Sequence, residues 1–349
     1  AKTGQRTTSM ITMASMTAGP RTANLTTVMY LFFHIATLTA FVSRGGEMVV
    51  SVIPGISAQA GSILFTAVCG GFMAVNKGSD IVEQVNNLLT AVVIIAFFGL
   101  LLFTVPQADP SALFGPSAVA NWSGGAACIP IMLQGLSFQS VVPTICASLE
   151  GDRRKIQQAI VVGSAIPLIM FVIWNGTLLA VQTGLERGMD PLMALAISKG
   201  PVMAAGIGVF SAAAVLTSFI GFVVSLTDFY GDAFKPSGAS EPEDTLMTRV
   251  RDYGLTLVPP LAVACYDPSL FLQALDKAGA FGVSFLFGLL PAWMALRQRA
   301  DGRKVLEAVP GFLGGYERGP LAPGGSLAVV IAGACGLKVI VDATLKLFY

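Results

Sequence analysis

The sequence predicts an all-α polytopic membrane protein, and three observations lead to this fold class. Hydrophobic residues make up 54% of the 349 residues and charged residues 12%, about half of the roughly 25% usual in soluble domains. The mean hydropathy is +0.73. Long apolar runs recur from Leu25 onward, each near the roughly 20 residues that a helix needs to cross a bilayer core. These properties exclude a soluble globular protein.

Nine stretches of low charge are predicted as transmembrane helices within a single membrane domain, residues 1–349. The fourth stretch is interrupted by Gly135 and Pro143, and the seventh is short. Because lipid-exposed backbone must satisfy its own hydrogen bonds, nearly the whole chain is expected to be helical. The nine predicted spans are residues 23–43, 56–75, 86–105, 125–149, 158–182, 203–227, 252–266, 279–296 and 325–347.

Three segments are predicted to lie outside the bilayer. Residues 1–22 form a polar N-terminal segment, and residues 234–250 and 298–324 mix charges with Gly and Pro, as solvated loops do. The loops on the side of the N-terminus carry 15 Lys and Arg residues, whereas the opposite loops carry four. Since cytoplasmic loops are enriched in these residues, we expect the N-terminus on the cytoplasmic side and Tyr349 on the other.

The interrupted fourth span is the first candidate site. Gly135 and Pro143 bracket small and polar residues at mid-membrane depth, which favours an unwound helix. Unwound backbone is tolerated there where it lines a cavity, and the two half-helix dipoles then point at the ligand. The alternative is a proline kink packed against neighbouring helices. The predicted substrate-binding residues of this span are Gly135, Ser137, Phe138, Gln139 and Ser140.

Two further spans contain candidate polar residues. Thr217 and Ser218 follow a stripe of small residues and offer hydroxyls to a solute. The alternative is that these hydroxyls bond to carbonyls of their own helix. His34 lies within the first span and is the candidate proton-coupling residue. The alternative interpretation of His34 is a neutral histidine that donates a hydrogen bond to a neighbouring carbonyl and has a packing role only.

Other functional classes find little support in the sequence. The net charge of +1 argues against nucleic acid as a partner. The single histidine and the absence of a CxxC pair provide no metal-ligand pattern, and no GxSxG or Walker-type motif is present. We therefore expect no enzyme activity, no metal and no cofactor. The five cysteines are interpreted as buried small side chains: Cys69, Cys128, Cys146, Cys265 and Cys335.

Several linked motifs resemble the tryptophan and tyrosine permeases of the hydroxy and aromatic amino acid permease family. Residues 137–143 (SFQSVVP), 151–156 (GDRRKI) and 163–170 (GSAIPLIM), followed by Trp174, are similar to that family's sixth helix, basic loop and seventh helix. Residues 217–221 with Asp228 and Phe229 resemble the eighth helix. Residues 30–41 with Gly45 and Gly46 resemble the third.

The resemblance implies a five-plus-five inverted-repeat transporter fold with eleven helices. The nine predicted spans then correspond to the third through eleventh helices, so that the sequence represents an incomplete version of that fold, lacking the first two. The family pattern at the broken sixth helix is Ser-Phe-Gly-aromatic-His, whereas residues 135–139 read Gly-Leu-Ser-Phe-Gln. Gln139 is an amide and does not carry a proton near neutral pH.

By this resemblance, the expected function is proton-coupled transport of tyrosine or tryptophan across a lipid bilayer. The alternative is a transport-inactive relative that acts as a structural subunit of a larger complex, with other membrane subunits as partners. The Ala and Gly content and the basic, acid-free start favour a plastid membrane. A bacterial-type inner or plasma membrane is the other predicted location.

Overall fold

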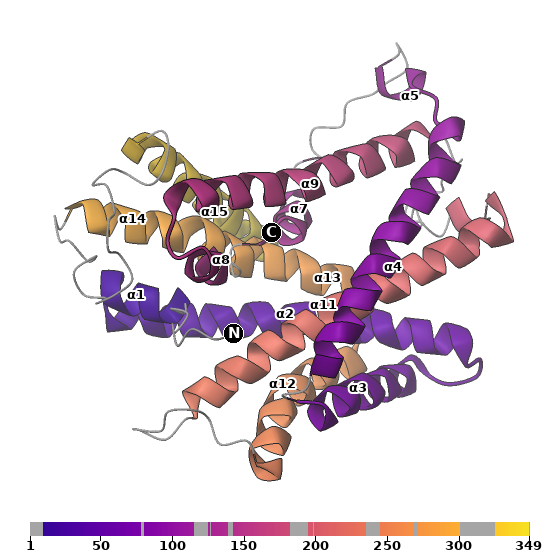
Figure 1. The fold of residues 1–349 in the computed structure, drawn as a ribbon, viewed down its shortest axis with the longest axis horizontal. Coiled ribbons are helices and arrows are strands. Elements are labelled where there is room, and N and C mark those ends of the chain that lie inside the picture. The colour runs from indigo at the N-terminus through magenta and orange to yellow at the C-terminus, as the bar shows by residue number, and fades with distance from the viewer. Residues whose placement is uncertain are drawn as a thin grey trace. The chain divides into compact units, whose positions relative to one another are not determined.

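The computed structural model describes residues 10–77, 80–114, 125, 127–138, 142–181, 195–197, 199–234, 245–267, 271–300 and 325–348. Every regular element in this part of the chain is a helix (Figure 1). In chain order, the elements are α1 (Met10–Ala18), α2 (Pro20–Val52), α3 (Ala58–Val75), α4 (Asp80–Thr104), η1 (Val105–Gln107), α5 (Ser111–Phe114), α7 (Ile129–Gly135), α8 (Val142–Ser148), α9 (Arg153–Ala180), α11 (Pro201–Ala233), α12 (Leu246–Tyr266), α13 (Phe271–Lys277), η3 (Ala278–Leu289), α14 (Leu290–Ala300) and α15 (Gly325–Phe348).

Seven helical stretches of the described chain are long and apolar enough to cross a membrane: Pro20–Val52, Ala58–Val75, Asp80–Thr104, Arg154–Ala180, Pro201–Gly231, Phe271–Arg297 and Leu327–Lys346. The polytopic helical class is therefore confirmed, whereas the count of nine spans and the inverted repeat are not. The fourth predicted span is divided between the short helices α7 and α8. The seventh predicted span lies within α12, a helix that also contains the charged residues Arg249, Arg251 and Asp252 and is not among the seven stretches.

Local capping places helix starts inside two segments that the sequence predicts as extramembrane. Within residues 1–22, α1 ends before Gly19, whose φ of +87° suits glycine, and α2 begins with Pro20. Within residues 234–250, the Thr245 hydroxyl accepts from the Thr248 N–H, and the Thr248 hydroxyl accepts from the Thr245 N–H. This capping box begins α12 at Leu246. Of residues 298–324, 298–300 belong to α14 and the rest lie outside the described residues.

The chain divides into two compact units, each formed by segments distant in sequence. Unit 1 comprises Ala1–Phe33, Trp122–Ile169 and Leu275–Tyr349, and unit 2 comprises His34–Asn121 and Met170–Ala274. In unit 1, η3 packs against α7, α14 and α15, and α1 packs against α14. In unit 2, α11 packs against α4 and α12, and α12 packs against α3.

Small residues bring the second half of α2 close to α3 in unit 2. A Cβ atom placed on Gly46 would lie 2.3 Å from the Ser62 hydroxyl oxygen and 2.8 Å from the Ser62 nitrogen. A Cβ atom on Gly61 would lie 2.5 Å from the Gly46 carbonyl oxygen. The ring of Phe65 packs edge-on against Phe219 of α11, with 5.1 Å between centroids. These contacts show the small-residue packing that helices in membranes use to approach one another.

A buried carboxylate links α12 to the loop between α3 and α4. Asp252 is 1% exposed, and its Oδ1 accepts from Nε and Nη2 of Arg251, each at 2.8 Å. The Lys77 ammonium lies 3.6 Å from the Asp252 Oδ2. The Tyr253 hydroxyl donates to the carbonyl of Met73 at 3.1 Å, in the last turn of α3. The cluster joins one anion to two cations and fixes the start of α12 beside the end of α3.

Candidate functional site

The predicted break in the fourth span is confirmed. Helix α7 ends at Gly135, and α8 begins at Val142; Figure 1 draws them as separate short helices before the long α9. The Ser137 N–H donates to the Gln134 carbonyl at 3.3 Å, and the Ser137 hydroxyl donates to the same oxygen at 2.8 Å. This i to i−3 bonding replaces the α-helical pattern, and the serine side chain closes the end of α7.

The structure describes three of the five residues predicted for this segment. Gly135 is the last residue of α7, Ser137 is half-buried, and Phe138 is 37% exposed. Gln139 and Ser140 lie outside the described residues. Gln134 is not among the predicted site residues; it is 8% exposed and lies one turn after Pro130 in the same short helix. In the sequence, Gln134 could have been identified as a candidate because it is an amide within an apolar run.

Helix α7 rests on a π-helix that the sequence did not predict. Element η3 is a π-helix of 12 residues, and the Ser284 hydroxyl donates to the Gly279 carbonyl, five residues earlier, at 3.1 Å. A Cβ atom on Gly279 would lie 1.9 Å from the Pro130 carbonyl oxygen. The backbone of α7 therefore lies directly against η3 at a position open only to glycine. π-Helical segments occur frequently at functional sites.

The turn between α8 and α9 positions the basic residues that follow the break. Glu150 and Gly151 adopt positive φ values of 51° and 75°. The Asp152 Oδ1 accepts from the N–H groups of Lys155 and Arg154, at 3.2 and 3.0 Å. Hydrogen bonding from the Lys155 backbone is the main cause that holds the pKa of Asp152 below its usual value. The carboxylate stabilises the positive end of α9.

His34 is buried in unit 2, where the second half of α2 meets α11. It is 3% exposed, and its Nε2 lies 3.2 Å from the Ser225 hydroxyl oxygen. The Phe222 ring lies 5.3 Å from the imidazole, centroid to centroid. The structure thus gives His34, the ionisable residue predicted within a membrane helix, a specific partner in Ser225, 191 residues away along the chain.

The two hydroxyls predicted on α11 differ in their surroundings. The Thr217 hydroxyl donates to the Ala214 carbonyl at 3.0 Å, as its alternative interpretation proposed. Ser218 is half-buried and lies seven residues before Ser225, two turns away on the same face of α11. The structure therefore brings Ser218 to the α11 face that meets His34. The segment from Gly135 to Phe138 belongs to unit 1.

Comparison with known proteins decides the family. The sequence profile of the tryptophan/tyrosine permease family matches residues 1–312. The chain belongs to this permease family. The predicted resemblance is confirmed, since the match covers most of the permease, including the break, His34 and the α11 face.

Individual relatives are similar at about a quarter identity. Tyrosine-specific transport system 1 of Haemophilus influenzae is 26% identical over 304 residues, 83% of the permease and 74% of the relative. A tryptophan-specific transport protein of the same organism is 24% identical over 260 residues, 70% of the permease and 59% of the relative. Glutamine transporter 2 of Aliivibrio fischeri is 24% identical over 342 residues, 95% of the permease and 82% of the relative.

These relatives bear on two predictions. They are named as transport proteins, so the alternative of a structural subunit is not favoured. They come from bacteria, and the plastid location therefore has no support. With its apolar helices, the permease is an integral membrane protein.

Proposed function

We propose that the permease carries an aromatic amino acid, tyrosine or tryptophan, across the membrane, and that the amino acid binds at the break between α7 and α8. Membership of a tryptophan/tyrosine permease family supports the substrate class. The observation that carries the location is the end of α7 at Gly135, seven residues before Val142. A helix that is interrupted within a predicted membrane span exposes backbone groups that suit a zwitterion.

The described residues of the break supply complementary chemistry. The last carbonyl groups of α7 carry the partial negative charge of a helix C-terminus, which attracts an ammonium group. Ser137 adds a hydroxyl whose oxygen remains an acceptor while it donates to Gln134. Phe138 presents an exposed ring, and aromatic rings attract one another at offset or edge-on geometries. We assign the ammonium to the α7 end and the substrate ring to Phe138.

We further propose that His34 carries the coupled proton. It is the one histidine of the sequence, and residue 139, where the family pattern has histidine, is glutamine. Histidine is a residue type that proteins use as a proton shuttle. Its burial and its contact with Ser225 suit a proton path along α11, which Ser218 extends. Ionisable groups inside membrane helices mark such paths.

Replacing Phe138 by alanine is expected to raise the half-saturating concentration for tyrosine by about three- to tenfold, because a ring pair contributes about 0.5–1.5 kcal/mol beyond burial. Uptake of labelled tyrosine into proteoliposomes that contain the full-length protein measures this effect. Phe114→Ala is the matched control, since Phe114 is 88% exposed on α5. An equal effect of both variants would contradict the assignment of Phe138.

Replacing His34 by glutamine is expected to uncouple transport from the proton gradient. Glutamine keeps a polar side chain opposite Ser225 but does not titrate. The variant should exchange external labelled tyrosine for internal tyrosine while losing accumulation driven by an imposed pH gradient. Both rates are measured in the same proteoliposomes, so exchange reports that the variant is folded. Gradient-driven accumulation at the wild-type level would remove His34 from the coupling mechanism.

A further inference from the structure

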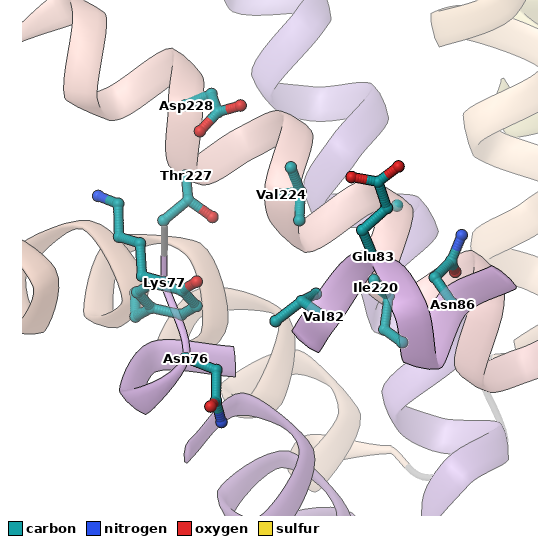
Figure 2. A pocket seen from close by; sticks show the side chains of 11 residues that line it. Asn76, Lys77, Val82, Glu83, Asn86, Ile220, Val224, Thr227 and Asp228 are labelled. Atoms are coloured by element: carbon teal, nitrogen blue, oxygen red, sulfur yellow. The ribbon is translucent and has the colours of Figure 1, made fainter. Parts of the chain in front are cut away.

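A cavity of about 410 Å³ lies in unit 2, and neither His34 nor Ser225 is among the described residues that line it. It is partly open and is lined by residues of the loop after α3, the first turns of α4, the second half of α11 and the first half of α12. Figure 2 shows side chains of both charges and apolar side chains around it. Its volume falls within the roughly 300–1,000 Å³ of small-molecule sites.

Among the described residues that line the cavity, Lys77 is the cation, and Glu83 and Asp228 are the carboxylates. The guanidinium of Arg251 takes the short contacts to Asp252, at 2.8 Å. Lys77 lines the cavity, and its ammonium lies 3.6 Å from the same carboxylate, beyond hydrogen-bonding distance. Arg251 and Lys77 share the single carboxylate of Asp252, so Asp252 does not by itself neutralise both cations. The Lys77 donors are therefore suited to a carboxylate that enters the cavity.

The first turns of α4 provide acceptors to the same cavity. Glu83 makes no ion pair with the part of the chain that the structure describes. Asn86 lies three residues later on the same helix face, and its buried Oδ1 has no hydrogen-bond donor among the described residues. Asp228 of α11 also lines the cavity. A buried acceptor without a donor is costly, and an ammonium group in the cavity would satisfy it.

Apolar side chains separate the two charged regions. In the view of Figure 2, Val82 and Val224 lie between Lys77 on the left and Glu83 on the right. The cavity thus combines a donor for a carboxylate, acceptors for an ammonium group and an apolar surface between them. A monovalent anion or cation alone would use one of these regions and leave the others unpaired.

We propose that this cavity is a second binding site for a zwitterionic amino acid with an apolar or aromatic side chain. Its carboxylate contacts Lys77, its ammonium group contacts Glu83 and the Asn86 oxygen, and its side chain lies against Val82 and Val224. The identity of the amino acid rests on the proposed function. Because Lys77 lies on the side predicted to be cytoplasmic, the site binds amino acid that has accumulated inside the cell and so senses the product of transport.

Binding of labelled tryptophan to the purified full-length protein, measured by scintillation proximity from micromolar to millimolar concentrations, tests the proposal. We expect two classes of site. Glu83→Gln should weaken the lower-affinity class at least tenfold, because it removes a charge-assisted contact to the ammonium group. Asn86→Ala should weaken the same class at least threefold. Tryptophan amide and N-acetyltryptophan, which each lack one of the two charges, should fail to displace it.

Asp80→Asn is the matched control, because Asp80 lies three residues before Glu83 on α4 and is exposed outside the cavity. It should leave both classes unchanged. A single class of site, or a weak class that Glu83→Gln and Asp80→Asn alter equally, would overturn the proposal. Uptake of labelled tryptophan into proteoliposomes is measured in parallel. If the protein shows a Glu83-dependent binding site but no uptake, the result contradicts the proposed function and leaves the second site standing. Uptake without such a site contradicts the second site alone.

Discussion

Replacing Gly279 by alanine is expected to lower the melting temperature of the permease and to abolish tyrosine uptake. The new Cβ atom would lie 1.9 Å from the Pro130 carbonyl oxygen and 2.6 Å from its carbon, both backbone atoms of α7. A change of side-chain rotamer cannot relieve a clash with backbone, so α7 and η3 must separate. Overpacking of a well-packed interior costs about 1–3 kcal/mol or more. The displaced element is the helix that ends at the proposed substrate site.

Gly163→Ala is the matched control for Gly279→Ala. Gly163 lies in α9, and the structure shows no neighbour within 4 Å of the position its Cβ would occupy. Alanine is favoured over glycine in a helix interior by about 1 kcal/mol, so this variant should be at least as stable as the wild type. Melting temperature and initial uptake rate are measured for both variants. If Gly279→Ala matched Gly163→Ala in both, α7 would not depend on this contact.

Replacing Asp252 by asparagine is expected to destabilise the permease by about 2–3 kcal/mol. Removing one partner of a buried ion pair costs about 3–5 kcal/mol, because the other charge is left uncompensated. The loss is smaller here, since the side chains of Arg251 and Lys77 are 37% and 24% exposed and keep part of their hydration. The cost falls on the contact between α12 and the end of α3.

Asp342→Asn separates the effect of burial from the loss of a carboxylate. Asp342 pairs with Lys338 on α15, where the two side chains are 51% and 75% exposed. An exposed pair contributes about 0–1 kcal/mol. Unfolding of both variants is followed by titration with a denaturing detergent. Adding Lys77→Met to Asp252→Asn should recover part of the lost stability. Equal losses for Asp252→Asn and Asp342→Asn would show that the buried cluster is not a stabilising contact.

The features predicted correctly from sequence have local causes. Gly135 and the residues that follow it act within a few positions, and the helix ends there because Ser137 bonds back to Gln134. Apolar runs of sufficient length define the seven spans in the same local way. The starts of α2 and α12 differ from the predicted starts of the first and seventh spans. The turn at Gly19 and the cap at Thr245 each act over about three residues, which is shorter than a hydropathy window.

The features that the sequence did not reveal depend on distant contacts or on weak periodicity. The Ser225 partner of His34 is 191 residues away, and Lys77 meets Asp252 across a similar separation. The π-helix η3 is apolar nearly throughout, so its residues carry no period that distinguishes it from an α-helix. Its contact with α7 at Gly279 involves Pro130, almost 150 residues earlier in the sequence.

The most direct test is competition against labelled tyrosine uptake by the full-length protein in proteoliposomes. Unlabelled tyrosine, tryptophan and glutamine are added in turn, and initial rates are compared with those of protein-free liposomes. We expect saturable uptake that tyrosine and tryptophan reduce and that glutamine leaves unchanged at the same concentration. Uptake no greater than in protein-free liposomes, or uptake that only glutamine competes among the added amino acids, would contradict an aromatic amino acid permease.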